Sequence, residues 1–406
     1  MHMKNLYLLL FILIAGCQSD VDKELNAGAW RLTLDLGNDN ELPVLIETTK
    51  ESQIILINDK ERITVNDVKI KGDSITFQPP IFEGIFKGIF IDNKTIKGHF
   101  IKPSLDRVVP FNMQYGKPHR FKVGTEEPSA NITGKWETVF SPDNDADRYI
   151  ALGIFNQNGQ RVTGTFRTTT GDYRYLDGVI EGNQLKLSTF DGAHAFLFKA
   201  TVTDSTINGT FYSGNHWQEP FTAQLNNDYE LPDARELTYL KEGYEQLDFS
   251  FKDSDGTSIS LSDSQFENKV VLVQILGSWC PNCMEETQFY VDYLKSNPDT
   301  NVQVIGLAFE YARTEEKAFQ SIERMKKQLQ IPYPILLAQY GNVDKNIAQE
   351  KLPMLNHILS YPTTIYIDKN GKVRRIHTGF NGKATGDSYV KFKDDFYLYL
   401  DSLSAE

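Results

Sequence analysis

Cysteine is scarce in this chain: only three occur among 406 residues, Cys17, Cys280 and Cys283. Residues 18–230 contain none, so disulfide bridges do not hold the first half of the protein together. Cys280 and Cys283 lack the further ligands of a four-coordinate zinc site, because there is no second cysteine pair and no histidine at ligand spacing. A disulfide that closes so small a loop would stabilise the fold little. These exclusions leave redox chemistry as the main hypothesis for the pair.

Positive charge is also in short supply. The chain has 42 Lys and Arg against 54 Asp and Glu, a formal net charge of −12. This balance argues against nucleic acid as a partner, since phosphate binding needs clustered Lys and Arg, and it disfavours electrostatic docking on anionic lipid. The 40% hydrophobic and 24% charged residues are typical of a folded globular protein, and the length favours two or three domains.

The apolar run at the N-terminus is too short to span a bilayer as a mature helix. The opening MHMKNLYLLLFILIAGC instead combines a basic start, a short apolar core and small residues before Cys17, as secretory signals do. Its last four residues, IAGC, resemble the bacterial lipobox. We predict a lipoprotein signal peptide at 1–16 and, over 17–27, an acylated Cys17 with a polar tether that anchors the protein in the cell envelope. It would face the periplasm or the cell surface, and Gln18 slightly favours the outer membrane. The alternative is a plain secreted protein.

Residues 28–227 show no long helical period. Short apolar, aromatic and β-branched runs alternate with turn residues at the spacing of an all-β sandwich or small barrel. One pattern occurs twice, at 28–116 and at 130–227, with its anchor residues in the same order and at nearly constant spacing. The matched positions are Trp30 with Trp136, Gly98 with Gly209, and Phe111 with Phe221. We expect a duplicated all-β region, in which each copy forms its own unit or both close into one larger structure. Its pattern indicates no function.

After residue 230 the pattern changes. Residues 231–245 predict a linker helix, because Asp233 and Glu236 form an arrangement like a capping box. Residues 246–406 alternate buried strands with helices. The expected strands are 269–276, 302–309 and a hairpin within 363–380, and the expected helices are 281–295, 314–329 and 388–403. The whole chain is therefore predicted to be multidomain, with the duplicated all-β region followed by an α/β thioredoxin-like domain.

The sequence GSWCPNC places the cysteine pair between a buried strand and a helix. Pro281 suits the first helical turn, where its missing N–H costs nothing, so Cys280 lies at the helix N-terminus. Unpaired backbone N–H groups and the helix dipole favour the thiolate there, which is the reactive form. We expect Cys280 to attack a substrate disulfide and Cys283, one turn further in, to resolve the mixed disulfide. No cofactor besides this redox-active pair is expected.

The segments KVVLVQILGSWCPNCMEE, VQVIGLAFE and YPTTIYIDKNGKV, followed by a closing helix, resemble the TlpA/ResA-type thiol–disulfide oxidoreductases over residues 246–404. These are membrane-anchored, thioredoxin-fold reductases of the bacterial cell envelope. The resemblance implies that Trp279 shields the nucleophile and that Pro362 is the family's cis-proline beside the cysteines. The backbone of Tyr361 would then bind an incoming peptide. The alternative for Pro362 is an ordinary edge-strand proline.

Glu286 lies on the same helix face as Cys283 and matches a glutamate of that family. It is a candidate proton relay for Cys283 if burial raises its pKa. An acid that only suits the helix dipole is an equal alternative, and that lesser role is the one we assign to Glu285. Many family members place proline directly before the second cysteine, whereas here it follows the first. The direction of the redox reaction therefore stays open. Tyr361 is bulky for its position, which suggests a narrow substrate range.

These observations predict a membrane-anchored enzyme that reduces disulfide-bearing envelope proteins and is recharged by a membrane thiol electron donor. Two other functions stay open. A thiol peroxidase with antioxidant activity would use the same fold, although the threonine of a Pro-x3-Thr-x2-Cys loop is absent. A ligand-binding lipoprotein would use the duplicated β region for capture and the redox domain as an accessory. The oligomeric state is not indicated.

Overall fold

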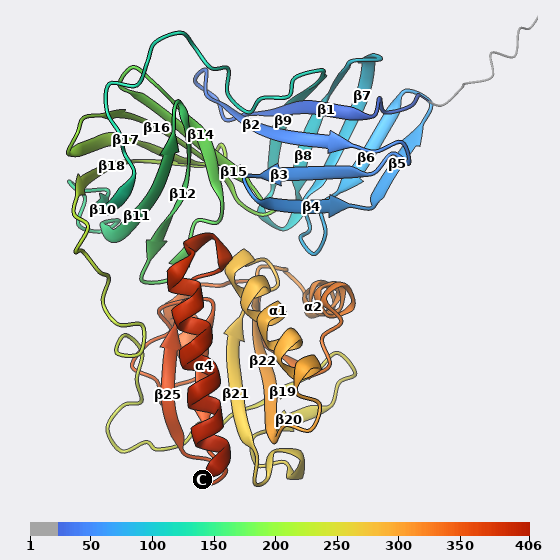
Figure 1. Ribbon diagram of the computed structural model, residues 1–406. Coiled ribbons are helices and arrows are strands. Elements are labelled where there is room, and N and C mark those ends of the chain that lie inside the picture. Colours follow the sequence, from blue (N-terminus) through green and yellow to red (C-terminus); the bar gives the residue numbers. More distant parts are fainter. Residues whose placement is uncertain (1–22) are drawn as a thin grey trace, which may run out of the picture.

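The computed structural model describes residues 23–406, which form two β-sheets followed by a mixed α/β domain (Figure 1). The predicted signal peptide at 1–16, Cys17 and the first part of the tether lie outside the described residues. Within 23–406, none of the helices has the length and apolar character needed to cross a bilayer.

The first sheet is antiparallel throughout and follows the order β4-β3-β2-β1-β9-β8-β7-β6-β5. In it β9, the last of these strands along the chain, returns to pair with β1. Its inward side chains are apolar at alternate positions, as a sheet with one buried face requires. The elements are β1 (Gly28–Asp35), β2 (Glu41–Thr48), β3 (Ile54–Asn58), β4 (Glu61–Val65), β5 (Asp67–Lys71), β6 (Ser74–Gln78), β7 (Ile85–Asp92), β8 (Thr95–Lys102), the 3-10 turn η1 (Pro103–Leu105) and β9 (Arg107–Tyr115).

The second sheet repeats this order and closes, because β11 also pairs with β12. A closed barrel leaves no long unpaired edge. Its elements are β10 (Gly134–Phe140), β11 (Tyr149–Asn158), β12 (Arg161–Thr168), β13 (Gly171–Asp172), β14 (Leu176–Glu181), β15 (Gln184–Phe190), β16 (Ala195–Val202), β17 (Thr206–Ser213) and β18 (Trp217–Leu225). The predicted all-β fold class is confirmed, with the second sheet a barrel rather than a sandwich.

The two tryptophans matched in the sequence occupy equivalent places. Both indoles are fully buried, one in the core of each sheet. Trp30 Nε1 donates to the carbonyl of Asn26 and Trp136 Nε1 donates to the carbonyl of Ile132, each over 2.9 Å. In both sheets the buried donor is thus satisfied by the residue four positions earlier, which fixes the entry into the first strand.

The matched glycines and phenylalanines are also equivalent, since Gly98 pairs with Phe111 and Gly209 pairs with Phe221 across neighbouring strands. A Cβ atom added at Gly98 would lie 2.0 Å from a backbone carbonyl of the neighbouring strand, and one at Gly209 would lie 2.4 Å from the corresponding carbonyl. Close backbone approach therefore requires glycine at this point of both sheets.

The C-terminal domain has a seven-stranded sheet of order β20-β19-β23-β22-β21-β24-β25. Strand β21 is buried along its whole length and runs parallel to β22, which explains why every position but Gln274 is apolar. The strands are β19 (Ser250–Lys252), β20 (Ser258–Ser260), β21 (Val270–Leu276), β22 (Val302–Glu310), β23 (Ile335–Tyr340), β24 (Thr363–Ile367) and β25 (Val373–Thr378). The helices are α1 (Pro281–Ser296), α2 (Glu315–Leu329), α3 (Lys345–Gln349) and α4 (Asp387–Ala405), with 3-10 turns η2 (Ser264–Phe266) and η3 (Lys383–Thr385).

The prediction of a linker helix at 231–245 is wrong, because this segment consists of turns and a single β-bridge. The Asp233 carboxylate accepts from the backbone N–H of Arg235 and pairs with its guanidinium, so it does not cap a helix. Further on, the backbone is bound to the C-terminal domain, where the N–H of Lys241 donates to Met354 over 2.8 Å. Tertiary hydrogen bonds have thus replaced the local ones of a helix.

Candidate active site

The cysteine pair lies where β21 gives way to α1. Cys280 is the N-cap residue of α1 and Pro281 occupies its first turn, as the sequence predicts. The N–H of Cys283 donates to Cys280 Sγ over 3.2 Å, so a free helix-terminal donor points at the sulfur. Both residues are free thiols; Cys280 is 6% exposed and Cys283 is completely buried. Burial raises the pKa of the Cys283 thiol well above its ordinary value.

Cys280 faces the segment that precedes β24. The Tyr361–Pro362 peptide bond is cis, and the Cys280 thiol donates to the Tyr361 carbonyl over 3.3 Å. Trp279 covers this side of the site, with its ring 5.5 Å from that of Tyr361 and 4.7 Å from that of Tyr311. The structure therefore brings together Trp279, Tyr361 and Pro362, the three residues that the resemblance named around the reactive thiol.

Glu286 lies inside the domain behind Cys283. Its side chain is completely buried and accepts a hydrogen bond from Gln274 Nε2 over 2.8 Å, and the same amide nitrogen reaches the Cys283 carbonyl at 3.5 Å. Burial outweighs the hydrogen bonds that favour the carboxylate and raises the pKa of Glu286 to about 7. A carboxyl group with such a pKa can accept and return a proton near neutral pH.

Glu285 does more than the sequence suggested. Its carboxylate is buried and forms an ion pair with Arg174, which follows β13, and Arg174 also pairs with Glu61 of β4. The backbone N–H of Lys383 donates to Glu285 as well, over 2.9 Å. One arginine therefore joins the first sheet, the second sheet and the redox helix. No local pattern could have revealed these contacts, because the partners lie 111 and 113 positions apart.

The turn between β12 and β13 lies against the cysteine loop. Ser360 Oγ donates to the carbonyl of Thr170 over 2.8 Å, and Asn282 Nδ2 donates to the carbonyl of Asp172 over 3.1 Å. The Asp172 carboxylate accepts from the N–H of Gly382 over 2.6 Å. The barrel formed by the second sheet therefore lies directly against the redox site, in the junction seen at the centre of Figure 1.

A cavity of about 200 Å³ remains in this junction beside Cys280. Its walls come from both sides: the barrel contributes Tyr173, His194 and Phe196, and the C-terminal domain contributes Trp279 and Lys345. The thiol of Cys280 is thus reached through a space that the β region helps to build. Within residues 23–406, no three His, Cys, Asp or Glu side chains are grouped to hold a metal ion.

Known proteins match the C-terminal part of the chain. The family model described as Redoxin matches residues 241–390. The thioredoxin-like protein YneN of Bacillus subtilis is 29% identical over 141 residues, which are 34% of this chain and 73% of YneN. The thiol–disulfide oxidoreductase ResA of Bacillus thuringiensis is 24% identical over 149 residues, which are 37% of this chain and 76% of ResA. A solved thiol–disulfide oxidoreductase from Bacteroides fragilis covers 37% of this chain and 99% of its own, at 17% identity and a TM-score of 0.28.

The C-terminal domain is therefore a Redoxin domain with a thioredoxin-like fold, as the sequence predicted. The protein is a thiol–disulfide oxidoreductase.

Proposed function

We propose that the protein reduces disulfides of other proteins in the bacterial cell envelope through Cys280 and Cys283. The observation that carries this proposal is the position of Cys280 at the start of α1, facing the Tyr361 carbonyl, with Cys283 completely buried behind it. One thiol can meet a substrate while the other is reserved for the second step. Trp279 would shield the mixed disulfide, and the backbone of Tyr361 would bind the substrate segment next to its cysteine.

The exchange takes place in two displacements. The Cys280 thiolate attacks one sulfur of the substrate disulfide, the substrate S–S bond breaks, and the first substrate thiolate leaves and takes up a proton. Cys283 then gives its proton to the Glu286 carboxylate and attacks Cys280 Sγ. The mixed disulfide breaks, the second substrate thiolate leaves, and the proton held on Glu286 is released to it or to solvent. The substrate gains two electrons, and the Cys280–Cys283 disulfide must be reduced again by a membrane thiol donor.

The N-terminal sequence supports an envelope location. The lipobox-like IAGC would place a lipid on Cys17, and the tether over 17–27 would connect it to the first sheet. Metabolic labelling with a radioactive fatty acid tests this part by itself. The wild-type chain should carry the label in the membrane fraction, and Cys17→Ser should not. An unlabelled, fully released wild-type protein would contradict lipid anchoring without touching the redox proposal.

The redox proposal is tested by trapping. Full-length Cys283→Ser should accumulate mixed disulfides with envelope proteins through Cys280, because the resolving thiol is gone. These adducts should disappear on reduction, and they should be absent from the matched control in which Cys280 is also replaced by serine. If Cys283→Ser captures no more protein than this control, Cys280 is not the attacking thiol and the proposal fails.

A further inference from the structure

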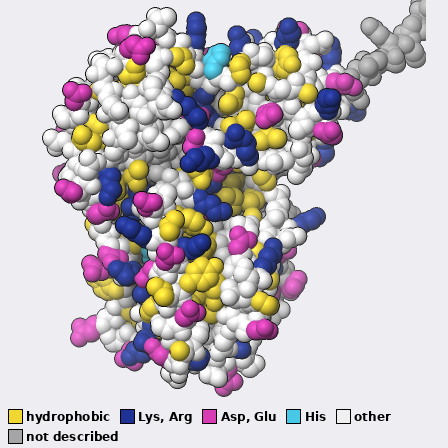
Figure 2. All heavy atoms as spheres, viewed as in Figure 1, with side chains coloured by type: hydrophobic (Ala, Val, Ile, Leu, Met, Phe, Trp, Pro, Cys, Tyr) yellow, Lys and Arg dark blue, Asp and Glu magenta, His cyan; other side chains and the backbone are white. Residues whose placement is uncertain are grey.

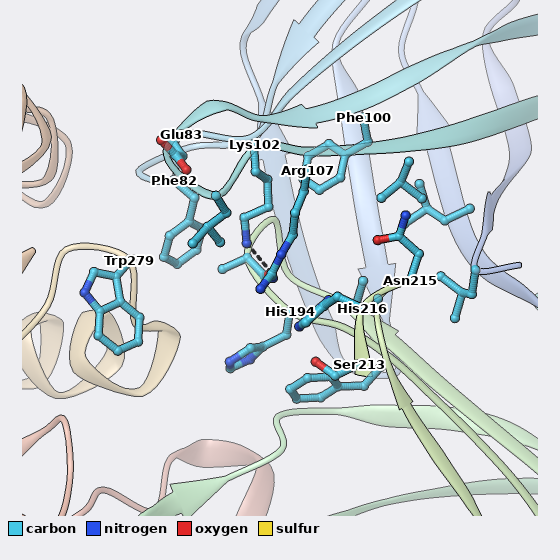
Figure 3. A pocket seen from close by; sticks show the side chains of 18 of the residues that line it. Phe82, Glu83, Phe100, Lys102, Arg107, His194, Ser213, Asn215, His216 and Trp279 are labelled. Atoms are coloured by element: carbon cyan, nitrogen blue, oxygen red, sulfur yellow. Dashed lines mark hydrogen bonds between the residues drawn. The ribbon is translucent and has the colours of Figure 1, made fainter. Parts of the chain in front are cut away.

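A second, larger cavity opens between the β region and the loop that carries Trp279 (Figure 3). Its volume is about 300 Å³, at the lower end of the range for small-ligand sites. Apolar rings such as Phe82 and Phe100 form much of its wall. Trp279 closes one end, so the cavity is built jointly by the first sheet, the barrel and the redox domain.

Two cations face this cavity from the first sheet. Lys102 ends β8 and Arg107 begins β9, and Figure 3 shows both side chains lying close together in the cavity. Lys102 Nζ donates to the carbonyl of Ala193 over 2.9 Å. The guanidinium of Arg107 is half-buried, and no carboxylate in the described part of the chain pairs with it. A half-buried cation with no carboxylate beside it is suited to an anionic ligand.

The other polar groups of the cavity wall do not neutralise the positive charge of Lys102 and Arg107. Glu83 is the one carboxylate in the wall among the described residues, and it is already bound by the hydroxyl and the backbone N–H of Ser104. His216 lies opposite the cations, and burial together with Arg107 and Lys102 lowers its pKa to about 4, so it is neutral near neutral pH. Figure 2 shows Lys and Arg side chains gathered beside hydrophobic ones where the β region meets the C-terminal domain, although the whole chain is acidic.

The larger cavity adjoins the reactive thiol. His194, Phe196 and Trp279 line both this cavity and the smaller one that contains Cys280. A molecule whose disulfide lies against Cys280 can therefore extend past these three side chains toward Lys102 and Arg107. The two cavities therefore share part of their walls.

We propose that the larger cavity, which we call the anion pocket, binds a carboxylate on an apolar body that belongs to the disulfide substrate of Cys280. The two cations would bind the carboxylate through charge-assisted hydrogen bonds, which the apolar side chains around them strengthen. The aromatic side chains would bury the apolar body. This inference rests on the proposed function, since the carboxylate is placed by the same disulfide that the cysteines reduce. The β region is then a specificity element of the enzyme.

Two chromogenic aromatic disulfides test the proposal on the reduced full-length protein. Dithiobis(nitrobenzoate) carries a carboxylate on each ring, and dithiodipyridine carries none. Cys280 displaces one aromatic thiolate and forms a mixed disulfide; Cys283 displaces the second and closes the Cys280–Cys283 disulfide, so two thiolates appear for two protein thiols. For each probe, the rate of the first thiolate release is divided by the rate at which free cysteine reacts with the same probe. This ratio corrects for the different intrinsic reactivities of the two disulfides. The wild-type protein should then favour the anionic probe by about tenfold or more.

Charge removal assigns this preference to the pocket. Lys102→Gln and Arg107→Gln should each slow the anionic probe by about tenfold, the effect expected of one lost charge-assisted hydrogen bond, and leave the neutral probe unchanged. Lys97→Gln is the matched control, because Lys97 lies on the same strand β8 but is exposed and outside the cavity. It should change neither rate. The neutral probe also reports that each variant is correctly folded at Cys280.

The outcomes test the anion pocket and the proposed function separately. If the neutral probe reacts at Cys280 but the wild-type protein shows no preference for the anionic probe, or if both pocket variants keep that preference, the anion pocket is refuted while the proposed function stands. If neither probe reacts at Cys280, both are refuted. Two peptide disulfides that differ only in carrying Glu or Gln near the cysteine then identify which kind of substrate supplies the carboxylate. A preference for the Glu peptide assigns the carboxylate to a protein substrate, and a preference confined to the aromatic probe assigns it to a small molecule.

Discussion

Replacement of Glu286 by glutamine should stabilise the C-terminal domain at alkaline pH and at the same time slow the second step of disulfide exchange. The physical reason is burial. The carboxyl group is completely buried, and its pKa is raised from 4.5 to about 7. The folded chain therefore retains this proton over a range of pH in which the unfolded chain has already lost it.

The raised pKa of Glu286 determines both the sign and the size of the effect on folding stability. Below the ordinary pKa of 4.5 both states are protonated and Glu286 contributes no pH dependence. As pH rises from 4.5 to about 7 only the unfolded state ionises, so it is progressively favoured and folding stability falls. At about 1.4 kcal/mol for each pH unit, the loss reaches about 3 kcal/mol. Glu286→Gln has no proton to lose, so it should be more stable than the wild type by up to that amount at about pH 8 and equally stable at about pH 4.

Urea unfolding followed by the helical circular dichroism signal measures this difference, because α1 to α4 all belong to the C-terminal domain. Glu316→Gln, an exposed position on α2, is the matched control and should show no such pH-dependent gain. The second thiol release from dithiobis(nitrobenzoate) measures the function. In the wild type its rate should rise with pH through about 7 as Glu286 ionises, and in Glu286→Gln it should lose that rise and fall by about a hundredfold.

A Glu286→Gln protein that is no more stable than the wild type at about pH 8 would show that the fold does not raise the pKa of this carboxyl group. An unchanged rate of the second release would refute the proton relay alone, since the buried carboxyl group would then serve only the fold.

Two further predictions concern the β region. Arg174→Met leaves the carboxylates of Glu61 and Glu285 buried without their cation and should lower the free energy of unfolding by about 3–5 kcal/mol in urea titrations. Replacing Glu61 and Glu285 by glutamine in the same variant should restore most of the lost free energy of unfolding. A lack of recovery would show that the arginine acts through packing instead. Gly209→Ala places a Cβ atom 2.4 Å from the Lys199 carbonyl and should cost about 1–3 kcal/mol in the same assay, whereas alanine at the exposed Asn208 of that strand should cost little.

Much of the fold could be predicted because its signals are local. The alternation of apolar residues along β3 and β6 marks strands with one buried face, and the nearly continuous apolar run of β21, broken only by Gln274, marks a strand buried on both. Thr314 caps α2 as its position before the acidic first turn suggests. The same kind of signal failed at 231–245, where the backbone hydrogen bonds go to distant residues rather than along a helix.

The sequence by itself determined the reactive centre. A buried strand, Pro281 in the first turn and two cysteines three positions apart are enough to put Cys280 at a helix start and Cys283 one turn inside, since these placements depend only on near neighbours. Only the tertiary structure decided what surrounds that centre: the ion pairs of Arg174, the barrel turn against Asn282 and the cations of the anion pocket. These contacts join residues far apart in the chain, 110 to 113 positions for Asn282 and Arg174 and 91 for Lys102 with Ala193. They depend on how separately folded units pack, and no periodicity or spacing within one segment records that packing.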